Sequence, residues 1–406
     1  MHRRDFLKRA IAPALILPAA TRRALAAAPK LKIKRIRIYD TPKPNLHFNQ
    51  SNKVVTIETD AGITGIGEGG SKDTVSQCAG FLINEDPLRI DHLWQYMYRG
   101  FFYPAGREKL HGLGALDLAL WDIKGKALGV PVWELLGGIA RDRVECYSTG
   151  FPSKGSVGET ARACIEAGFR SYRTSVVEAG PDRVYNTRQA VDKTFEQCRE
   201  IRNAIGPNAD WHIDFHTRID LPDALRLATL LEPLNPFLIE DPVRSENKAV
   251  LKAYRSHIKI PLAVGEQFGD RWDIRELIED NTIDYSRVTL PNSGGITEFM
   301  KIAALCETHY VGLVPHFTGP ISVAALVHCL GAYPGPVLME MAGAGTVPLD
   351  YLPQQADFRK GSLWPNTRPG LGVELVTKPL TLLGEVTEKT SPIPSLRRPD
   401  GSLTNW

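Results

Sequence analysis

Hydrophobic and polar residues along the first third of the chain predict a group of strands followed by helices. The segments KIKRIRIYD and KVVTIETD alternate between apolar and polar positions, which is typical of strands with one buried face. The next segment, AGITGIGEGG, supplies glycines for turns. From Leu113 to Gly129 apolar residues recur with helical spacing, and Pro131 follows the end of this helix. We therefore expect an α+β domain over residues 29–143.

The pattern changes near residue 144, where short apolar strands begin to alternate with amphipathic helices. Stretches such as ALRLATLL and ITEFMKIAALC have the apolar stripe of a helix. The candidate strands are VECYSTG, RSYRTSVV, DWHIDFH, PFLIEDPV, PLAVGEQ, YSRVTLP, YVGLVPHF and PVLMEMA. Strands that alternate with helices in this way predict a closed parallel barrel over residues 144–350. Residues 351–406 are rich in Pro and Gly, and we expect them to pack back on the N-terminal domain.

Composition and charge exclude several other classes of protein. The chain has 406 residues, of which 43% are hydrophobic and 23% are charged, so it can bury a sizeable core. This length suits a barrel of about 250 residues and a smaller domain. The net charge of +3 gives no indication of a nucleic acid partner. After residue 30 no apolar stretch is long enough to span a bilayer, so we expect no membrane contact once the N-terminus is removed.

The first 28 residues have the features of an export signal. Arg3 and Arg4 are followed by Phe-Leu-Lys, then by an apolar run over residues 10–20 and a small-residue cleavage site at residues 24–26. This arrangement resembles a bacterial twin-arginine signal. The alternative is a basic amphipathic helix. We expect export to the periplasm by the twin-arginine route, which carries folded proteins.

Three carboxylates occupy equivalent places at the ends of successive strands. Asp214 in WHIDFH, Glu240 in FLIEDPV and Glu266 in LAVGEQ are equally spaced along the chain. The C-terminal ends of parallel strands meet at one face of a barrel, where barrel active sites are built. Clustered anions raise one another's pKa unless a cation lies among them. The alternative is three unrelated acids on loops, but three acids in register favour a Mg²⁺ site.

Two histidines lie near the ends of these strands. His216 comes two residues after Asp214, so both side chains should point into the barrel mouth, where a histidine can move protons near neutral pH. A structural or metal-ligating histidine is the alternative. His316 ends the seventh strand in GLVPHFTGP, a position that favours a catalytic or substrate-binding role. His212, deeper in the third strand, is expected to be a hydrogen-bonded core residue.

Four further residues are candidates for substrate binding or proton transfer. Arg173 and Ser175 end the second strand in SYRTSV, and Arg173 could bind a substrate carboxylate or act as the partner of a base. Tyr185 lies in the following loop, where an Arg beside it would lower the pKa of its phenol. The alternative for Tyr185 is an ordinary surface aromatic residue. Glu340 on the eighth strand could contact substrate, or it could be a buried acid paired with a neighbouring base.

These residues, in this order, resemble the enolase superfamily, and within it the mandelate racemase and muconate lactonizing group. The segment ALDLALWDIKGKALGVPVWELLGG resembles that group's capping-domain signature, and Asp214, Glu240 and Glu266 resemble its Mg²⁺ ligands. The resemblance covers nearly all of the chain after the export signal. It implies an α/β fold: a (β/α)7β modified TIM barrel with an α+β N-terminal capping domain that the C-terminal segment completes.

Within this group the Asp-x-His pair in WHIDFH resembles the acid-sugar dehydratases, such as mannonate and galactonate dehydratases. In mannonate dehydratase-like members an Arg on the second strand partners a Tyr as base. Arg173 matches that Arg, and Tyr185 matches the Tyr by its offset. In galactonate dehydratase-like members the seventh-strand His, here His316, pairs with an Asp whose place Thr289 takes. The second strand also lacks the Lys-x-Lys base of the racemases.

The resemblance implies loss of water from a sugar acid. Mg²⁺ would stabilise the enediolate that forms when a base removes the α-proton, and His216 would protonate the leaving β-hydroxyl. The product would be a 2-keto-3-deoxy acid. Two alternatives stay open: a cycloisomerase or epimerase on a related carboxylate, and a catalytically weak sugar-acid binding protein. We expect Asn45, in a capping loop, to contact substrate, and the protein to form a homo-oligomer of two to eight subunits.

Overall fold

The computed structural model describes residues 29–43, 53–390 and 396–405. The fold described below belongs to one compact unit, Leu31–Trp406. The export signal expected in residues 1–28 and the candidate substrate contact Asn45 lie outside the described residues. Both therefore stay predictions.

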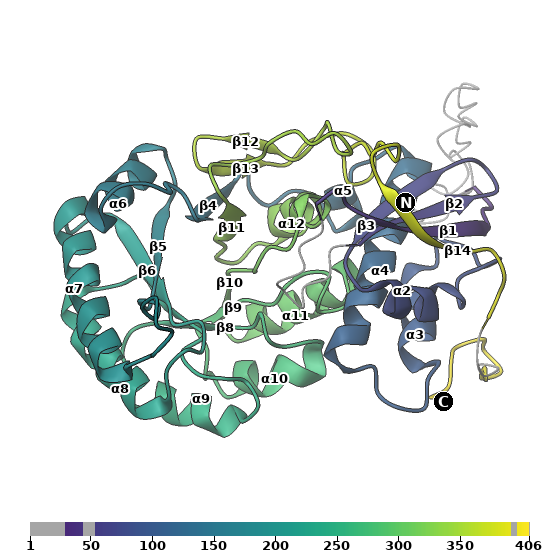
Figure 1. Cartoon of the computed structure of the whole chain (residues 1–406). Coiled ribbons are helices and arrows are strands. Elements are labelled where there is room, and N and C mark those ends of the chain that lie inside the picture. The colour runs from purple at the N-terminus through teal and green to yellow at the C-terminus, as the bar shows by residue number, and fades with distance from the viewer. Residues whose placement is uncertain (1–28, 44–52, 391–395, 406) are drawn as a thin grey trace, which may run out of the picture. The chain divides into compact units, whose positions relative to one another are not determined.

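An antiparallel sheet covered by helices forms the N-terminal capping domain (Figure 1). Ile36 and Ile38 of the first strand are fully buried, as the alternation predicts. A register shift between Ile33 and Arg35 keeps Ile33 buried as well. The elements are β1 (Ile33–Asp40), β2 (Val54–Thr59), β3 (Thr64–Glu68), α2 (Lys72–Ala79), α3 (Ile90–Arg99), α4 (Gly106–Leu128) and α5 (Val132–Leu135).

The last strand of the C-terminal segment completes this sheet, as the sequence predicts, whereas residues 362–363 of the same segment pair with the first barrel strand. Strand β14 (Thr381–Val386) pairs antiparallel with β1, so the sheet order is β14-β1-β2-β3. In Figure 1 the yellow β14 lies beside the purple β1. The capping domain is therefore built from both ends of the described chain.

Two glycines of the segment AGITGIGEGG have a different role from the one expected. Gly65 and Gly67 lie inside strand β3 and form no turn. A Cβ atom at Gly65 would lie 2.0 Å from the carbonyl oxygen of Ala119, and one at Gly67 would lie 1.9 Å from that of Ala115. These glycines are required because α4 packs directly on the backbone of β3.

The second domain is a parallel barrel in which each of the first seven strands is followed by a helix (Figure 1). The first seven strands pair in parallel with one another in chain order. The strands are β4 (Val144–Thr149), β5 (Ser171–Ser175), β6 (Asp210–Asp214), β7 (Ile239–Glu240), β8 (Leu262–Val264), β9 (Tyr285–Ser286), β10 (Gly312–Leu313) and β11 (Met339–Ala342). The helices are α6 (Val157–Glu166), α7 (Thr187–Ile205), α8 (Leu221–Leu231), η2 (Glu232–Leu234), α9 (Lys248–Arg255), α10 (Arg271–Glu279), α11 (Ile296–Thr308) and α12 (Pro320–Ala332).

The barrel closes between its first and last strands. Strand β11 pairs in parallel with β4, and a bridge between Leu313 and Val337 links β10 to the start of the last strand segment. A hairpin of β12 (Asp357–Arg359) and β13 (Ser362–Trp364) follows β11 in place of an eighth helix. The predicted (β/α)7β barrel with a capping domain is therefore confirmed.

Side chains of the capping domain dock on barrel loops and helix ends. Trp94 of α3 is fully buried, and its indole N–H donates to the carbonyl oxygen of Gly294 at 2.8 Å. Asp117 of α4 accepts a hydrogen bond from the backbone N–H of Thr297 at 2.9 Å. None of the helices in the described residues is long and apolar enough to cross a membrane.

Candidate active site

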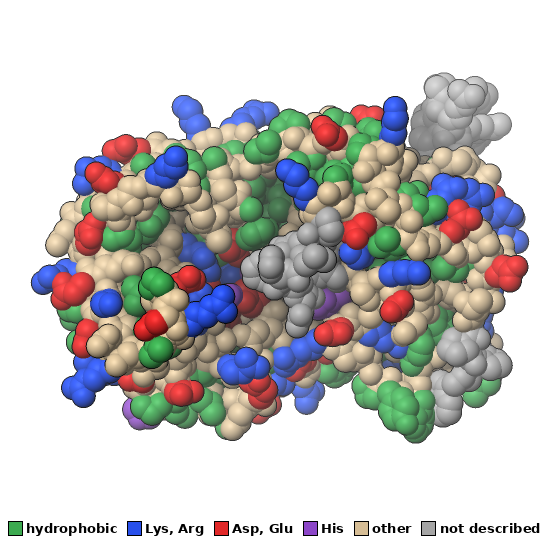
Figure 2. Space-filling view, viewed as in Figure 1, with side chains coloured by type: hydrophobic (Ala, Val, Ile, Leu, Met, Phe, Trp, Pro, Cys, Tyr) green, Lys and Arg blue, Asp and Glu red, His purple; other side chains and the backbone are tan. Residues whose placement is uncertain are grey.

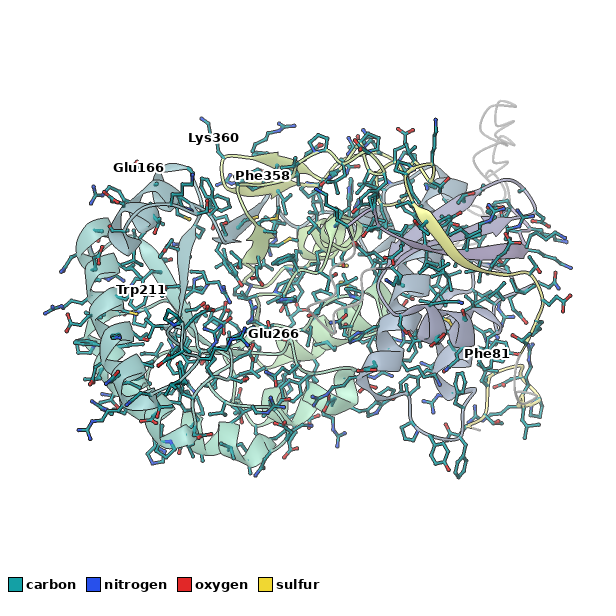
Figure 3. All side chains as sticks on the ribbon, viewed as in Figure 1. Phe81, Glu166, Trp211, Glu266, Phe358 and Lys360 are labelled. Atoms are coloured by element: carbon teal, nitrogen blue, oxygen red, sulfur yellow. The ribbon has the colours of Figure 1, made fainter. Side chains whose placement is uncertain are left out.

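Three acids lie at the C-terminal ends of adjacent barrel strands. Asp214 and Glu240 are the last residues of β6 and β7, and they are partners in the register of that pair. Glu266 follows the end of β8. Asp214 and Glu240 are fully buried, whereas the side chain of Glu266 keeps 12% exposure. In Figure 3 Glu266 lies among nitrogen- and oxygen-bearing side chains inside the ring of barrel strands.

Arg173 links the first two of these acids. This residue of β5 forms an ion pair with Asp214 through Nη2, and its Nε lies 3.5 Å from Oε2 of Glu240. Burial alone would lower the pKa of Arg173, but the two carboxylates outweigh burial and raise it. The sequence left two roles open for Arg173, the partner of a base and a contact to a substrate carboxylate. The contact to a substrate carboxylate stays a prediction.

A second arginine, which sequence reasoning missed, links the other acids. Arg287 is fully buried after β9. Its Nη1 lies 3.2 Å from Oε1 of Glu240, and its Nη2 lies 3.1 Å both from Oε2 of Glu266 and from Oε2 of Glu340. The segment YSRVTLP contained the signal, because an arginine that alternates with Tyr285 on an apolar strand must face the barrel interior.

Acidic groups outnumber the guanidinium groups at this end of the barrel. Burial raises the pKa of Asp214, and the nearby Glu240 and Glu266 add to this shift against the effect of Arg173. Asp241 is also buried, and its pKa is raised well above the ordinary value by burial and by Glu266. For Glu240, by contrast, Arg287 and His212 outweigh burial and lower the pKa. The two arginines therefore neutralise only part of the charge that these carboxyl groups would carry if all were ionised.

The donor chemistry of the three acids fits a hard divalent cation. They offer carboxylate oxygens, which Mg²⁺ prefers, and the buried Oε2 of Glu240 has no hydrogen-bond partner. The arrangement is nevertheless held by Arg173 and Arg287. Within the described residues, no three His, Cys, Asp or Glu side chains are grouped so that they could hold a metal ion. A Mg²⁺ site at these acids therefore stays a prediction.

Two histidines flank one of the acids, Glu266. Nε2 of His216 lies 3.9 Å from Oε1 of Glu266, and Nε2 of His316 lies 3.6 Å from Oε2 of the same carboxylate. The His216 backbone N–H donates to Oδ1 of Asp214 at 2.6 Å, and its imidazole is 45% exposed. Two imidazoles that can transfer protons thus lie near the two different oxygens of the Glu266 carboxylate. Figure 2 shows acidic and basic side chains, and one histidine patch, on the central part of the viewed face.

Thr289 is the partner of the other nitrogen of His316. Its hydroxyl lies 3.3 Å from Nδ1 of His316, at the place where the resemblance implies an Asp. A threonine hydroxyl cannot supply the negative charge that stabilises an imidazolium. The Nε2 atom of His316 lies beside the carboxylate of Glu266, and the positive charge of a protonated His316 also helps to lower the pKa of Glu340.

Tyr185 does not lie where the sequence interpretation placed it. Its hydroxyl donates to the carbonyl oxygen of Val177 at 3.2 Å, and the cation that acts on its phenol is Arg218. The expectation that Arg173 would lower the pKa of Tyr185 is wrong, because burial raises this pKa. The loop after β5 directs the phenol to its own backbone, and the ring is half-buried against the core, so Tyr185 is not the ordinary surface aromatic of the alternative either.

The other candidate residues are placed as follows. Ser175 ends β5 opposite Asp214 in the register, so it stays a candidate substrate contact. Glu340 accepts hydrogen bonds from Arg287 and Thr149, as the alternative of a buried paired acid predicts. Burial would raise the pKa of Glu340, but Arg287 outweighs burial and lowers it. His212 is a fully buried core residue, as expected, with Nδ1 2.7 Å from the hydroxyl of Ser171.

Comparison with known proteins identifies the family. A family model described as enolase C-terminal domain-like matches residues 156–378, and one described as mandelate racemase / muconate lactonizing enzyme, N-terminal domain, matches residues 46–137. The chain is 36% identical to a D-galactonate dehydratase of Ralstonia pickettii over 93% of this chain and 100% of that protein. It is 37% identical to a D-galactonate dehydratase of Xanthomonas oryzae over 86% of this chain and 95% of that protein.

Solved structures give the same result. A member of the enolase superfamily from Salmonella Typhimurium has a TM-score of 0.81 at 25% identity and covers 88% of this chain and 100% of its own. An enolase from Pantoea ananatis with bound D-gluconate and Mg has a TM-score of 0.77 at 28% identity, over 86% of this chain and 94% of its own. Together with the dehydratase relatives, the fold and site define a barrel enzyme of the hydro-lyase class. The chain belongs to the mandelate racemase and muconate lactonizing group of the enolase superfamily.

Proposed function

We propose that this enzyme dehydrates a sugar acid in a Mg²⁺-dependent reaction. The observation that carries the proposal is the placement of two histidines on opposite oxygens of Glu266, at the end of a row of strand-end acids. The relatives named for D-galactonate, and the Pantoea ananatis structure with D-gluconate and Mg, support a six-carbon sugar acid as substrate. The product would be a 2-keto-3-deoxy acid.

The residues divide the work as follows. Asp214, Glu240 and Glu266 would hold Mg²⁺, which when bound supplies positive charge against the charge that develops on the substrate carboxylate. His316 takes the α-proton through Nε2, and His216 donates a proton to the departing β-hydroxyl. Tyr185 with Arg173 is the alternative base. The hydrogen bond from the Tyr185 hydroxyl to Val177 supports His316 instead.

A screen of sugar acids tests this proposal. Purified protein is incubated with a set of hexonates and Mg²⁺, and 2-keto products are detected by semicarbazide absorbance while exchange of the α-proton with D₂O is followed by NMR. A dehydratase yields 2-keto product, whereas an epimerase or cycloisomerase shows exchange without it. Binding without either signal would instead identify a sugar-acid binding protein, the second candidate, which the hydroxyl of Thr289 beside His316 favours.

We further propose that the enzyme is exported through the twin-arginine pathway. Arg3, Arg4 and the apolar run that follows are the basis for this proposal. Replacing both arginines with Lys keeps the charge but removes the paired guanidinium groups, so the double variant should accumulate in the cytoplasm. Cell fractionation and immunoblotting measure the distribution. Normal export of the double variant would refute the proposal.

A further inference from the structure

The helix that follows His316 begins without a cap of its own. Helix α12 starts at Pro320, its N-cap is Gly319, and no side chain of the helix start caps its first turn. The first N–H groups of a helix have no partner within the helix, so a buried helix start needs an acceptor from elsewhere. His316 and Gly319 belong to one short segment, HFTGP, so the position of this helix start also determines where His316 lies.

That acceptor comes from the capping domain. Glu68, the last residue of β3, is 1% exposed, and its Oε2 accepts hydrogen bonds from the backbone N–H groups of Ile321 and Ser322, each at 3.0 Å. A Cβ atom at Gly319 would lie 1.9 Å from Oε1 of Glu68. Only glycine at residue 319 therefore allows the carboxylate to reach both N–H groups.

We propose that Glu68 is a positioning residue that holds the His316 segment in place from the capping domain. The carboxylate fixes the first turn of α12. This turn then fixes the four residues that precede it, from His316 to Gly319. This proposal rests on the proposed role of His316 in proton transfer. It also gives the capping domain a part in catalysis that does not require contact with substrate.

Burial makes the ionised form of this carboxylate costly. Burial raises the pKa of Glu68 from 4.5 to about 7, against the effect of the two N–H donors. A raised pKa in the folded state means that the folded protein holds this proton more tightly than the unfolded chain. The associated stability is present below about pH 4.5 and is lost as the pH rises through about 7. Tyr351 is a titratable side chain near Glu68, and burial, with a smaller effect of Glu68, raises its pKa to about 12.

Two variants separate the length of this side chain from its charge. Glu68→Asp keeps the charge but is one methylene too short to reach both N–H groups. Glu68→Gln keeps the length and an acceptor oxygen but loses the charge. We expect Glu68→Asp to lower kcat by about 10- to 100-fold with KM nearly unchanged, because displacement of a catalytic group by about 1 Å has an effect of this size. Glu68→Gln should retain kcat within about threefold between pH 6 and 9.

Gly319→Ala acts on the same contact from the barrel side and decides the question if Glu68→Asp does not fold. Its Cβ atom would displace the carboxylate while Glu68 itself is unchanged. Asp122→Ala is the matched control. Asp122 is another fully buried acid of the capping domain, and it accepts from the N–H groups of Ile66 at 3.0 Å and Leu371 at 2.8 Å, neither of which belongs to the His316 segment. This control should lower the melting temperature but leave kcat unchanged at 25 °C.

Amide hydrogen exchange tests the contact independently of turnover. In Glu68→Asp and Gly319→Ala, peptides covering residues 316–323 should exchange at least about tenfold faster than in the wild type, because the cap of the first turn is lost. Glu68→Gln and Asp122→Ala should leave these peptides unchanged. A wild-type protein without dehydratase activity would overturn the proposed function but not this contact. Unchanged kcat in both contact variants, or faster exchange spread evenly over the chain, would overturn the positioning role.

Discussion

Replacing Glu266 with Gln is expected to weaken Mg²⁺ binding by more than about 100-fold. Loss of a residue that only hydrogen-bonds to a metal ligand weakens binding by about 10- to 100-fold, and loss of a ligand itself should have a larger effect. Glu266 is the most accessible of the three strand-end acids, and Gln has the same shape. The amide oxygen can still accept the hydrogen bond from Nη2 of Arg287, so the fold should survive. Isothermal titration calorimetry with Mg²⁺, after treatment with EDTA, measures the loss. Dehydration should fall with it.

Glu340→Gln is the matched control for this experiment. Glu340 and Glu266 accept from the same nitrogen of Arg287 at the same distance of 3.1 Å, but only Glu266 is a proposed metal ligand. The control variant should therefore bind Mg²⁺ with nearly wild-type affinity. Equal affinity in both variants and in the wild type would show that the strand-end acids do not bind the metal.

The order of elements could be predicted from the sequence because each βα unit repeats the same local pattern. The lengths of the strands could not. The segment PFLIEDPV predicts a strand of eight residues, but the ladder of β7 contains only Ile239–Glu240. Hydrophobic residues on both sides of this ladder are buried against the barrel interior and the helices, so burial extends further than the hydrogen bonds. A hydrophobic run therefore indicates where a strand is buried, and the partner strand determines how much of it pairs.

The acids at the strand ends could be predicted from their spacing in the sequence. The residues that form ion pairs or hydrogen bonds across the site could not. Asp214 and Glu240 were found because strand ends of a parallel barrel meet at one face. Arg287 was missed because its role depends on carboxylates from three other strands. Glu68 was missed for the same reason, since its partners lie more than 250 positions further along the chain.

Tyr185 shows the limit of matching a residue by its offset alone. Its position relative to Arg173 agrees with the mannonate dehydratase-like pattern, but the loop between them determines where the phenol points. In this chain the loop returns the hydroxyl to the backbone of Val177, so the ring contacts its own segment. Side-chain direction in a loop depends on backbone conformation, which the spacing of residues does not determine.

Replacing His216 with Asn is expected to stop dehydration while exchange of the substrate's α-proton continues. His216 lies on the Oε1 side of Glu266 and is 45% exposed, so its imidazole is accessible to a leaving hydroxyl. His316 lies on the Oε2 side and remains intact in this variant. Loss of one general acid should lower dehydration by about 10² to 10⁴-fold. Semicarbazide absorbance measures dehydration, and NMR in D₂O measures exchange.

His316→Asn is the complementary variant, and it should lose exchange and dehydration together. Removal of the α-proton precedes departure of the hydroxyl, so a missing base stops both steps, whereas a missing acid stops only the second. Asn also keeps a polar group that can contact the hydroxyl of Thr289, which limits the change in local structure. If His216→Asn instead abolishes exchange as well, while calorimetry shows that it still binds Mg²⁺, then His216 is the base and the two histidines have the opposite roles. The more exposed imidazole of His216 would then act on the α-carbon, and the less exposed one of His316 on the leaving group.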